Sequence, residues 1–387
     1  MTTTKNNENK KLNVPNLRFP EFEGEWEKCK LGGICTFLSG GTPKVDVKEY
    51  WDGTIPFVSA ISMHDTYISD TNLHISEEGL NHGSKLLIKN NLLLLVRGSM
   101  LWKSIPVCLN KNDVAFNQDV KGLIANDTVN NRFLLYWLKS KEQRLKYMVT
   151  GTGLGAGKLD TNDLLSMSVY VPAMNEQYKI AKLLSLIDER IATQNKIIEY
   201  LKKLKSAISE NLFKAVNGDV VILSEICEII KGKQINSEFL SEKGKYYVMN
   251  GGTEPSGYYS DYNVEANTIS ISEGGNSCGY VQFNTSPFWS GGHCYTIQKI
   301  ADNVDHLYLY HYLKSKEDAI MKLRIGSGLP NIQKKDLAMF KIKLPTVEQQ
   351  KSISTFLSSL ERKAEIEEML LNAMKKEKQY LLRQMFI

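Results

Sequence analysis

Two stretches of the chain decide the fold: residues 174–215, MNEQYKIAKLLSLIDERIATQNKIIEYLKKLKSAISENLFKA, and residues 347–387, VEQQKSISTFLSSLERKAEIEEMLLNAMKKEKQYLLRQMFI. Neither contains proline, and in both the apolar residues recur at steps of three and four. This spacing is typical of helices that pair along an apolar seam. A helix of about 42 residues would be roughly 60 Å long, which exceeds the width of a small domain. The length therefore favours pairing of the two helices over packing of each helix on its own domain.

The residues predicted to form this seam occupy matching places in the two stretches, and each series includes one polar position. They are Ile180, Leu184, Ile187, Ile191, Gln194, Ile198 and Leu201 in the first stretch, and Ile353, Leu357, Leu360, Ala364, Glu367, Leu371 and Met374 in the second.

The two helices belong to an internal repeat. Residues 133–142, FLLYWLKSKE, match residues 308–317, YLYHYLKSKE, and residues 31–40 match residues 223–232. From Pro172 and Pro345 onward, matching positions are 173 residues apart. The sequence thus predicts an N-terminal segment, two front domains and two helical spacers, with bounds at 1–25, 26–172, 173–217, 218–345 and 346–387.

Each front domain has a mixed pattern. Short apolar runs such as 92–96 and 268–272 predict strands, and Gly-rich turns separate them. One helix is expected at about 131–147 and again at about 305–322, followed by a last strand before each proline. The predicted fold class is α+β, with two mixed α/β domains, each followed by a long helix. The two helices are expected to pair as an antiparallel coiled coil with pseudo-twofold symmetry.

The composition is that of an ordinary globular protein. The chain has 387 residues with 42% hydrophobic and 24% charged residues, and a net charge of +5. No apolar run is long enough to cross a membrane, and none resembles a signal peptide. The six cysteines form no C-x-x-C pair, which makes a zinc site improbable. These features indicate a cytoplasmic protein without a membrane partner.

Motifs for catalysis are missing from the sequence. Residues 151–158, GTGLGAGK, depart from a phosphate-binding loop because Thr152 and Leu159 stand where glycine and Ser or Thr are needed. The His293-Cys294 pair suggests a nucleophile, but its counterpart in the first repeat is Val120-Lys121, which favours a packing role. The triplet 361–363, Glu-Arg-Lys, is interpreted as a solvated helix face. We therefore assign no catalytic residue, metal site or cofactor to this chain.

The sequence resembles the specificity subunits of type I restriction-modification systems over nearly its whole length. The resemblance lies in the opening residues 17–22, LRFPEF, with Trp26. It lies also in the twin junctions 172–177, PAMNEQ, and 345–350, PTVEQQ, and in residues 271–281, ISEGGNSCGYV.

The resemblance implies that the front domains are target recognition domains for a bipartite sequence in double-stranded DNA. The helices would set the spacing and dock two modification methyltransferase subunits, with restriction/translocase subunits added to the complex. S-adenosylmethionine, ATP and Mg²⁺ would bind those partners, and this chain would be non-catalytic. The alternative is a two-headed coiled-coil adaptor that binds proteins without DNA specificity.

Loops are the usual place for contacts to bases and phosphates, and glycine allows close approach of the backbone. The DNA-binding candidates are Ser39, Gly40, Gly41, Thr42, Lys44, Arg97, Ser99, Asn117, Thr152 and Lys158 in the first domain, and Lys231, Lys233, Glu273, Asn276, Ser290, Ser327, Asn331 and Gln333 in the second.

A four-residue insertion between Ile191 and Ile198 tests whether the long helices set the spacing between the two half-sites. It adds about 6 Å of helix, which corresponds to about two base pairs of DNA. We expect the methylated motif, read by single-molecule sequencing, to gain a longer spacer while both half-sites stay unchanged. A paired insertion in the second helix should restore the stability lost to the shifted seam. An active variant with an unchanged spacer would contradict the hypothesis that the helices set the spacing.

Overall fold

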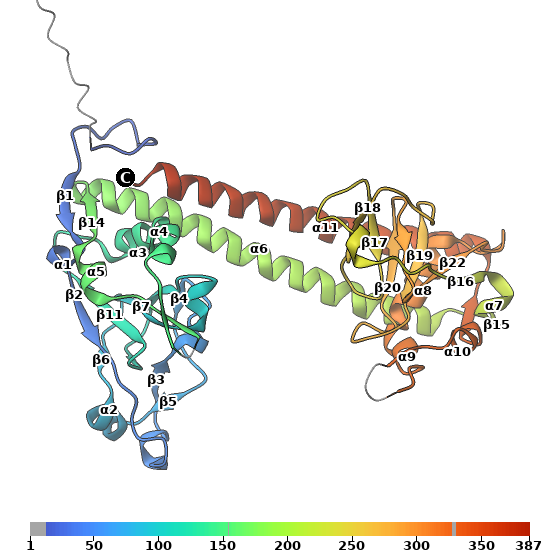
Figure 1. Cartoon of the computed structure of the whole chain (residues 1–387), viewed down its shortest axis with the longest axis horizontal. Coiled ribbons are helices and arrows are strands. Elements are labelled where there is room, and N and C mark those ends of the chain that lie inside the picture. Colours follow the sequence, from blue (N-terminus) through green and yellow to red (C-terminus); the bar gives the residue numbers. More distant parts are fainter. Residues whose placement is uncertain (1–12, 154, 327–329) are drawn as a thin grey trace, which may run out of the picture. The chain divides into compact units, whose positions relative to one another are not determined.

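The computed structural model describes residues 13–153, 155–326 and 330–387, which form two compact units (Figure 1). Unit 1 comprises Met1–Gln194 and Leu370–Ile387, and unit 2 comprises Asn195–Met369. Each unit therefore contains one front domain and a segment of both long helices.

The long helices are α6, Met174–Ala215, and α11, Val347–Gln384. In unit 1 the beginning of α6 packs against the end of α11, since Leu381 and Leu382 pack against the hydrophobic core that contains Leu184. In unit 2 the end of α6 packs against the beginning of α11, where Phe213 and Leu357 share the second core. The predicted α+β fold with antiparallel helix pairing is confirmed. The seam residues named from the sequence are all buried or half-buried.

A buried carboxylate joins three helices in unit 1. Asp188 of α6 forms an ion pair with Lys378 of α11. It also accepts a hydrogen bond of 2.9 Å from the hydroxyl of Tyr136 in α3, Asn131–Ser140. Burial, followed by the charge of Asp188, raises the pKa of Tyr136, so its hydroxyl remains a donor. The arrangement ties the front domain to both long helices.

An equivalent arrangement occurs in unit 2. Its residues on the two long helices are each 173 positions from their counterparts in unit 1. Glu361 of α11 accepts hydrogen bonds from Lys205 of α6 at 2.6 Å and from Tyr310 at 3.1 Å. Tyr310 lies in α8, His306–Ser315. Of the triplet expected on a solvated helix face, Arg362 and Lys363 are exposed, whereas Glu361 is partly buried and bonded to Lys205 and Tyr310. Its partners are distant in sequence and come together only when the helices pair.

The core of the front domain in unit 1 is a five-stranded sheet in the order β2-β11-β7-β9-β4. A four-stranded sheet β5-β3-β10-β6, a three-stranded sheet β12-β13-β8 and the pair β1-β14 complete it. The strands are β1 Glu27–Lys30, β2 Cys35–Ser39, β3 Ile55–Val58, β4 Tyr67–Ile68, β5 His74–Ile75, β6 Leu86–Leu87, β7 Leu92–Leu95, β8 Arg97–Gly98, β9 Val107–Asn110, β10 Val114–Phe116, β11 Val120–Ala125, β12 Thr150–Thr152, β13 Ala156–Lys158 and β14 Ser168–Val171. The helices besides α3 and α6 are α1 Leu31–Ile34, α2 Glu77–Gly83, α4 Glu142–Tyr147 and α5 Thr161–Ser166, with 3-10 turns at Lys48–Tyr50, Ala60–Ser62 and Ser99–Trp102.

Unit 2 repeats this plan with fewer strands. The sheet β16-β22-β19-β20 corresponds to β2-β11-β7-β9, and the pair β15-β23 corresponds to β1-β14. The parallel pair β17-β21, with β18 beside it, corresponds to β3-β10. The strands are β15 Asp219–Ile222, β16 Glu228–Lys231, β17 Tyr246–Met249, β18 Gly257–Tyr259, β19 Thr268–Ser272, β20 Val281–Asn284, β21 Trp289–Ser290, β22 Cys294–Gln298 and β23 Lys341–Leu344. The remaining helices are α7 Leu223–Ile226, α9 Glu317–Met321 and α10 Lys334–Ala338, with a 3-10 turn at Ser237–Phe239.

The helix expected at about 131–147 is two helices, and so is its counterpart at about 305–322. The break between α3 and α4 falls at Lys141, which has φ −94° and ψ 10°. The preceding residue, Ser140, donates its hydroxyl to the carbonyl of Trp137 at 2.7 Å. Such local side-chain bonds compete with continuation of a helix.

The opening segment packs onto the start of α6. Arg18 forms two hydrogen bonds of 2.8 Å with the buried carboxylate of Glu176, and the indole of Trp26 donates a third at 3.3 Å. The equivalent of Glu176 in the second repeat is the exposed Gln349. The arginine and tryptophan of the opening motif therefore have a structural role in unit 1.

A buried glutamine explains why the twin junctions resemble each other. Gln350 accepts a hydrogen bond from the backbone N–H of Asp305 at 2.9 Å and donates to the carbonyls of Asn303 and Pro345 at 3.1 and 2.9 Å. Gln177 makes the same three bonds, to Asn130, Thr128 and Pro172. The glutamine thus fixes α8 or α3 against the start of the long helix.

Replacement of Gln350 by alanine should lower the free energy of unfolding by about 2–4 kcal/mol, because it leaves buried backbone groups without partners. Denaturant unfolding of the purified chain measures the effect. Replacement of the exposed neighbour Gln349 by alanine is the matched control and should change stability by less than about 0.5 kcal/mol. Equal effects of the two substitutions would contradict the role of Gln350.

Candidate nucleic-acid interface

The loops chosen from the sequence of the first domain meet at one edge of the five-stranded sheet. Strand β2 ends at Ser39, opposite Lys121 at the start of β11, and Val120 lies opposite Leu95 at the end of β7. Because neighbouring strands are antiparallel, the end of β2, the start of β11 and the end of β7 lie side by side. We call this edge of unit 1, with the loops that continue from it, edge 1.

The backbone at edge 1 is tightly packed around glycine. The N–H of Gly41 donates to the carbonyl of Phe116 at 3.0 Å. A Cβ atom on Gly40 would lie 2.2 Å from that same oxygen, so any other residue would force the loop away. Asn117 follows Phe116 directly and accepts a hydrogen bond from the backbone of Asp119. Glycine therefore allows the first candidate loop to lie against the end of β10.

A short sheet extends edge 1. In the register of β8 and β13, Arg97 lies opposite Lys158 and Gly98 lies opposite Gly157. Strands β12 and β13 pair antiparallel with each other, which agrees with a structural role for the described residues of the stretch 151–158. Arg97 is exposed, and Lys158 lies 3.6 Å from the carboxylate of Asp160. Edge 1 thus carries two cations in adjacent strands.

The other first-domain candidates differ in whether their side chains already form hydrogen bonds within the domain. Ser39 accepts a hydrogen bond from Lys121, Thr42 donates to Gln118, and Thr152 donates to its own hairpin. Lys44 and Ser99 are exposed.

Sequence reasoning missed two side chains at edge 1. Lys121 lies beside Ser39, and Trp102 is exposed while its indole donates to the carbonyl of Gly155 at 3.0 Å. An exposed aromatic ring among basic residues is typical of surfaces that bind nucleic acids. The signal for Trp102 was its place three residues after Ser99, the last residue of the Gly-rich turn 97–99.

Unit 2 presents an equivalent edge, which we call edge 2. Strand β16 ends at Lys231, opposite Tyr295, and Ser272 at the end of β19 lies opposite Cys294. Matching this register to edge 1 places Cys294 at the position of Val120, one residue from the alignment made by sequence. The turn after β19 is joined to Asn331 by a bridge with Gly274.

The remaining second-domain candidates lie on or beside edge 2. Lys233, Asn276 and Asn331 are exposed, Gln333 is half-buried before α10, and Ser290 is buried. Ser327 lies outside the described residues.

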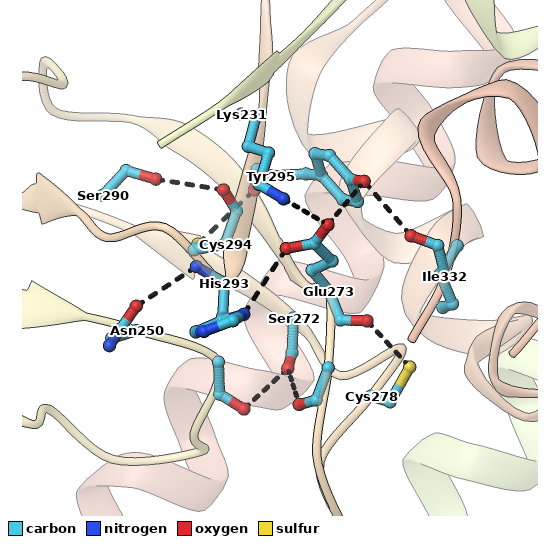
Figure 2. A network of polar contacts seen from close by, with 12 residues as sticks. Lys231, Asn250, Ser272, Glu273, Cys278, Ser290, His293, Cys294, Tyr295 and Ile332 are labelled. Carbon is cyan, nitrogen blue, oxygen red and sulfur yellow. Dashed lines mark hydrogen bonds and ion pairs between the residues drawn. The ribbon is translucent and has the colours of Figure 1, made fainter. Parts of the chain in front are cut away.

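A polar network centres on Glu273, which is only 6% exposed (Figure 2). Its Oε1 accepts hydrogen bonds from Lys231 Nζ at 2.6 Å and from the Tyr295 hydroxyl at 3.0 Å. Its Oε2 is buried without a hydrogen-bond partner, and the nearest recorded polar atom is Nδ1 of His293 at 3.7 Å. Burial, followed by the hydrogen bond to Glu273, raises the pKa of Tyr295.

The His293-Cys294 pair divides between surface and core. Cys294 is buried with Phe288, and burial raises the pKa of its thiol to about 11, so it is not a thiolate near neutral pH. The side chain of His293 is 64% exposed. The packing role expected for the pair therefore holds for Cys294 and is wrong for His293.

The described part of the chain was also compared with the requirements for a metal site and for a membrane span. Within residues 13–153, 155–326 and 330–387, no group of three or more His, Cys, Asp or Glu side chains is placed to hold a metal ion. Among the helices of those same ranges, none combines the length and the apolar character needed to span a membrane.

Comparison with known proteins gives consistent matches. The family model of the type I restriction modification DNA specificity domain matches residues 23–203 and 216–376. The EcoR124I/EcoR124II specificity subunit of Escherichia coli is 32% identical over 174 residues, which is 44% of this chain and 43% of that protein. The MjaVIII specificity subunit of Methanocaldococcus jannaschii is 27% identical over 400 aligned positions, which cover 90% of this chain and 88% of that one.

A solved structure shares the fold. The S subunit of a type I restriction-modification system from M. genitalium superimposes with a TM-score of 0.66 at 21% identity, covering 97% of this chain and 99% of that chain. The similarity therefore extends through both front domains and both long helices.

Proposed function

The chain belongs to the type I restriction modification DNA specificity family, and we propose that this DNA specificity subunit reads a bipartite sequence in double-stranded DNA, one half with each unit. Edge 1 and edge 2 are the proposed reading surfaces. The observation that carries the proposal is that the same strands end at the same edge in both units, while the side chains there differ.

The differences are chemical and lie at matching backbone positions. The N–H of Val96 in unit 1 and the N–H of Glu273 in unit 2 donate to the carbonyls of Asp119 and His293, respectively. Val96 of unit 1 thus corresponds to Glu273 of unit 2, and Asp119 of unit 1 corresponds to His293 of unit 2. Two edges of one design with different donors and acceptors suit two different half-sites, since base edges are distinguished by their donor and acceptor patterns.

Basic side chains on both edges supply contacts to the DNA backbone. Arg97 and Lys121 lie on edge 1, and Lys231 and Lys233 lie on edge 2. Contacts of this kind position a protein on DNA and contribute much of its affinity, whereas contacts to base edges select the sequence.

The long helices are the proposed docking surface for two modification methyltransferase subunits, with restriction/translocase subunits joining the complex. Large apolar side chains are exposed on both helices in each unit, and such side chains mark protein interaction sites where they form a contiguous patch. They are Tyr178, Leu186, Leu370 and Tyr380 in unit 1, and Ile197, Tyr200, Phe356, Ile366 and Met369 in unit 2.

The chain by itself is proposed to be non-catalytic, with S-adenosylmethionine, ATP and Mg²⁺ bound by the partner subunits. This assignment places the protein in the cytoplasm with the DNA. Its support is the sequence, in which no cofactor or nucleotide motif was found.

Purified chain supplied with S-adenosylmethionine, Mg²⁺ and ATP should neither methylate nor cleave DNA. Addition of the modification subunits should give methylation, detected by transfer of a labelled methyl group to DNA that carries the target. The same mixture without this chain is the control and should lack sequence-specific methylation. Stoichiometric methylation by the isolated chain would refute the non-catalytic assignment.

Exchange of residues 218–345 for the equivalent domain of another specificity subunit should change one half-site of the methylated motif. The exchange spares both long helices because β15 and β23, which begin and end the domain, pair with each other. Exchange of residues 26–172 is the matched experiment and should change the other half-site. Sequencing of methylated DNA gives the result, and a change in both halves from either exchange would contradict independent reading.

A further inference from the structure

The orphan oxygen of Glu273 marks a site that is incomplete in the free chain. A buried carboxylate oxygen without a hydrogen bond is costly, because it has lost water and gained no donor. Oε1 is fully used by Lys231 and Tyr295, whereas Oε2 has only Nδ1 of His293 nearby, at 3.7 Å. That separation is slightly too long for a hydrogen bond, and a small movement of the exposed imidazole would close it.

The backbone beneath His293 is held firmly. Its carbonyl accepts from the N–H of Glu273 at 2.9 Å, and its N–H donates to the side chain of Asn250 at 3.1 Å. Gly251, with φ +86°, packs so closely that a Cβ there would lie 3.0 Å from the carbonyl of His293. The side chain therefore projects from a fixed point on edge 2 (Figure 2).

Building on the proposed function, we propose that His293 is a DNA-contacting side chain of unit 2 and that Glu273 is its positioning residue. On binding, imidazole takes up a proton from solvent, Nδ1–H bonds Oε2 of Glu273, and Nε2–H donates to an acceptor on the DNA. That acceptor is a phosphate oxygen or the O6/N7 edge of guanine, both of which accept from a cationic donor.

Charge supports the cationic form of His293 in the complex. The carboxylate of Glu273 is balanced by Lys231 alone, so a second cation beside Oε2 gives the site the net positive charge that a polyanion favours. Edge 1 has Val96 and Asp119 at these positions, so the pair belongs to unit 2 only.

The other titratable groups recorded around Glu273 are one lysine and three groups whose pKa values are raised by burial. They are Lys231 on β16, Cys294 and Tyr295 on β22, and Cys278 in the turn after β19; burial raises the pKa of Cys294 to about 11 and also raises the pKa values of Tyr295 and Cys278. Histidine is the residue type that changes charge between about pH 5 and 8. A pH dependence of this contact therefore reports on His293.

The experiment measures binding of the complete complex with its modification subunits to a randomised DNA library at pH 6 and pH 8. We compare wild type, His293→Gln and Glu273→Gln, with His306→Gln as the control because His306 is exposed on α8 away from edge 2. At pH 6, both edge variants should bind roughly 10- to 100-fold more weakly than wild type. At pH 8 the difference should narrow, and His306→Gln should follow wild type at both pH values.

The library also distinguishes the two acceptors. If His293 contacts guanine, His293→Gln relaxes one position of the half-site read by unit 2 and leaves the other half-site unchanged. If it contacts phosphate, affinity falls evenly across sequences and the salt dependence drops by about one charge. Either result supports the contact.

Three outcomes overturn the proposal. One is that His293→Gln binds like wild type at both pH values. Another is an equal loss at pH 6 and pH 8, which would indicate a structural role. The third is loss for His293→Gln with none for Glu273→Gln, which would remove the positioning role. A wild-type complex without any sequence preference would instead refute the proposed function itself.

Discussion

The structure depends on one constraint, the partly buried carboxylate that each long helix presents to its partner. Asp188 and Glu361 are each neutralised by a lysine of the opposite helix and hydrogen-bonded by a tyrosine of a front domain. Removal of either lysine would leave a partly buried carboxylate without its charge partner, which destabilises the pairing of the helices. An apolar seam alone allows helices to slide by a turn, whereas an interhelical ion pair is satisfied in one register. The ion pair therefore determines which residues of α6 and α11 face each other. The hydrogen bond from the tyrosine fixes the front domain to the helices in that register.

Much of this fold was accessible from the sequence, because the repeat shows every feature twice. The periodicity of residues 174–215 identified α6 to its last residue, and the shared prolines located the junctions. What escaped prediction depends on distant partners. The contacts of Glu361 were not predicted because its lysine is 156 residues away. The break at Lys141 was missed because the apolar pattern continues through it, while a local serine hydroxyl and backbone angles end the helix.

The candidate site likewise has features that the sequence predicted and features that depend on partners distant in sequence. Glycine-rich turns were chosen for their backbone freedom, and the register of the sheets brings several of them to one edge in each unit. Lys121 and His293 were not chosen, since each begins to matter only when a strand start is placed beside the end of another strand. Ser290 was chosen for its neighbours in sequence, but it is buried. Sequence predicts which loops contain polar groups, whereas strand pairing decides which of those groups meet.

Unit 1 is made of two separate segments of the chain, which determines when its core can be completed during synthesis. Its core includes Met385 and Phe386, and the aromatic ring of Phe386 packs against Phe133. These residues are translated only after all of unit 2, which is a continuous segment of the chain. Domains generally fold as units during synthesis, so unit 2 has its complete set of core residues first. Until synthesis passes Phe386, the nascent unit 1 exposes the apolar surface that this ring covers, and that interval is when the emerging chain is most open to aggregation or to protection by a chaperone.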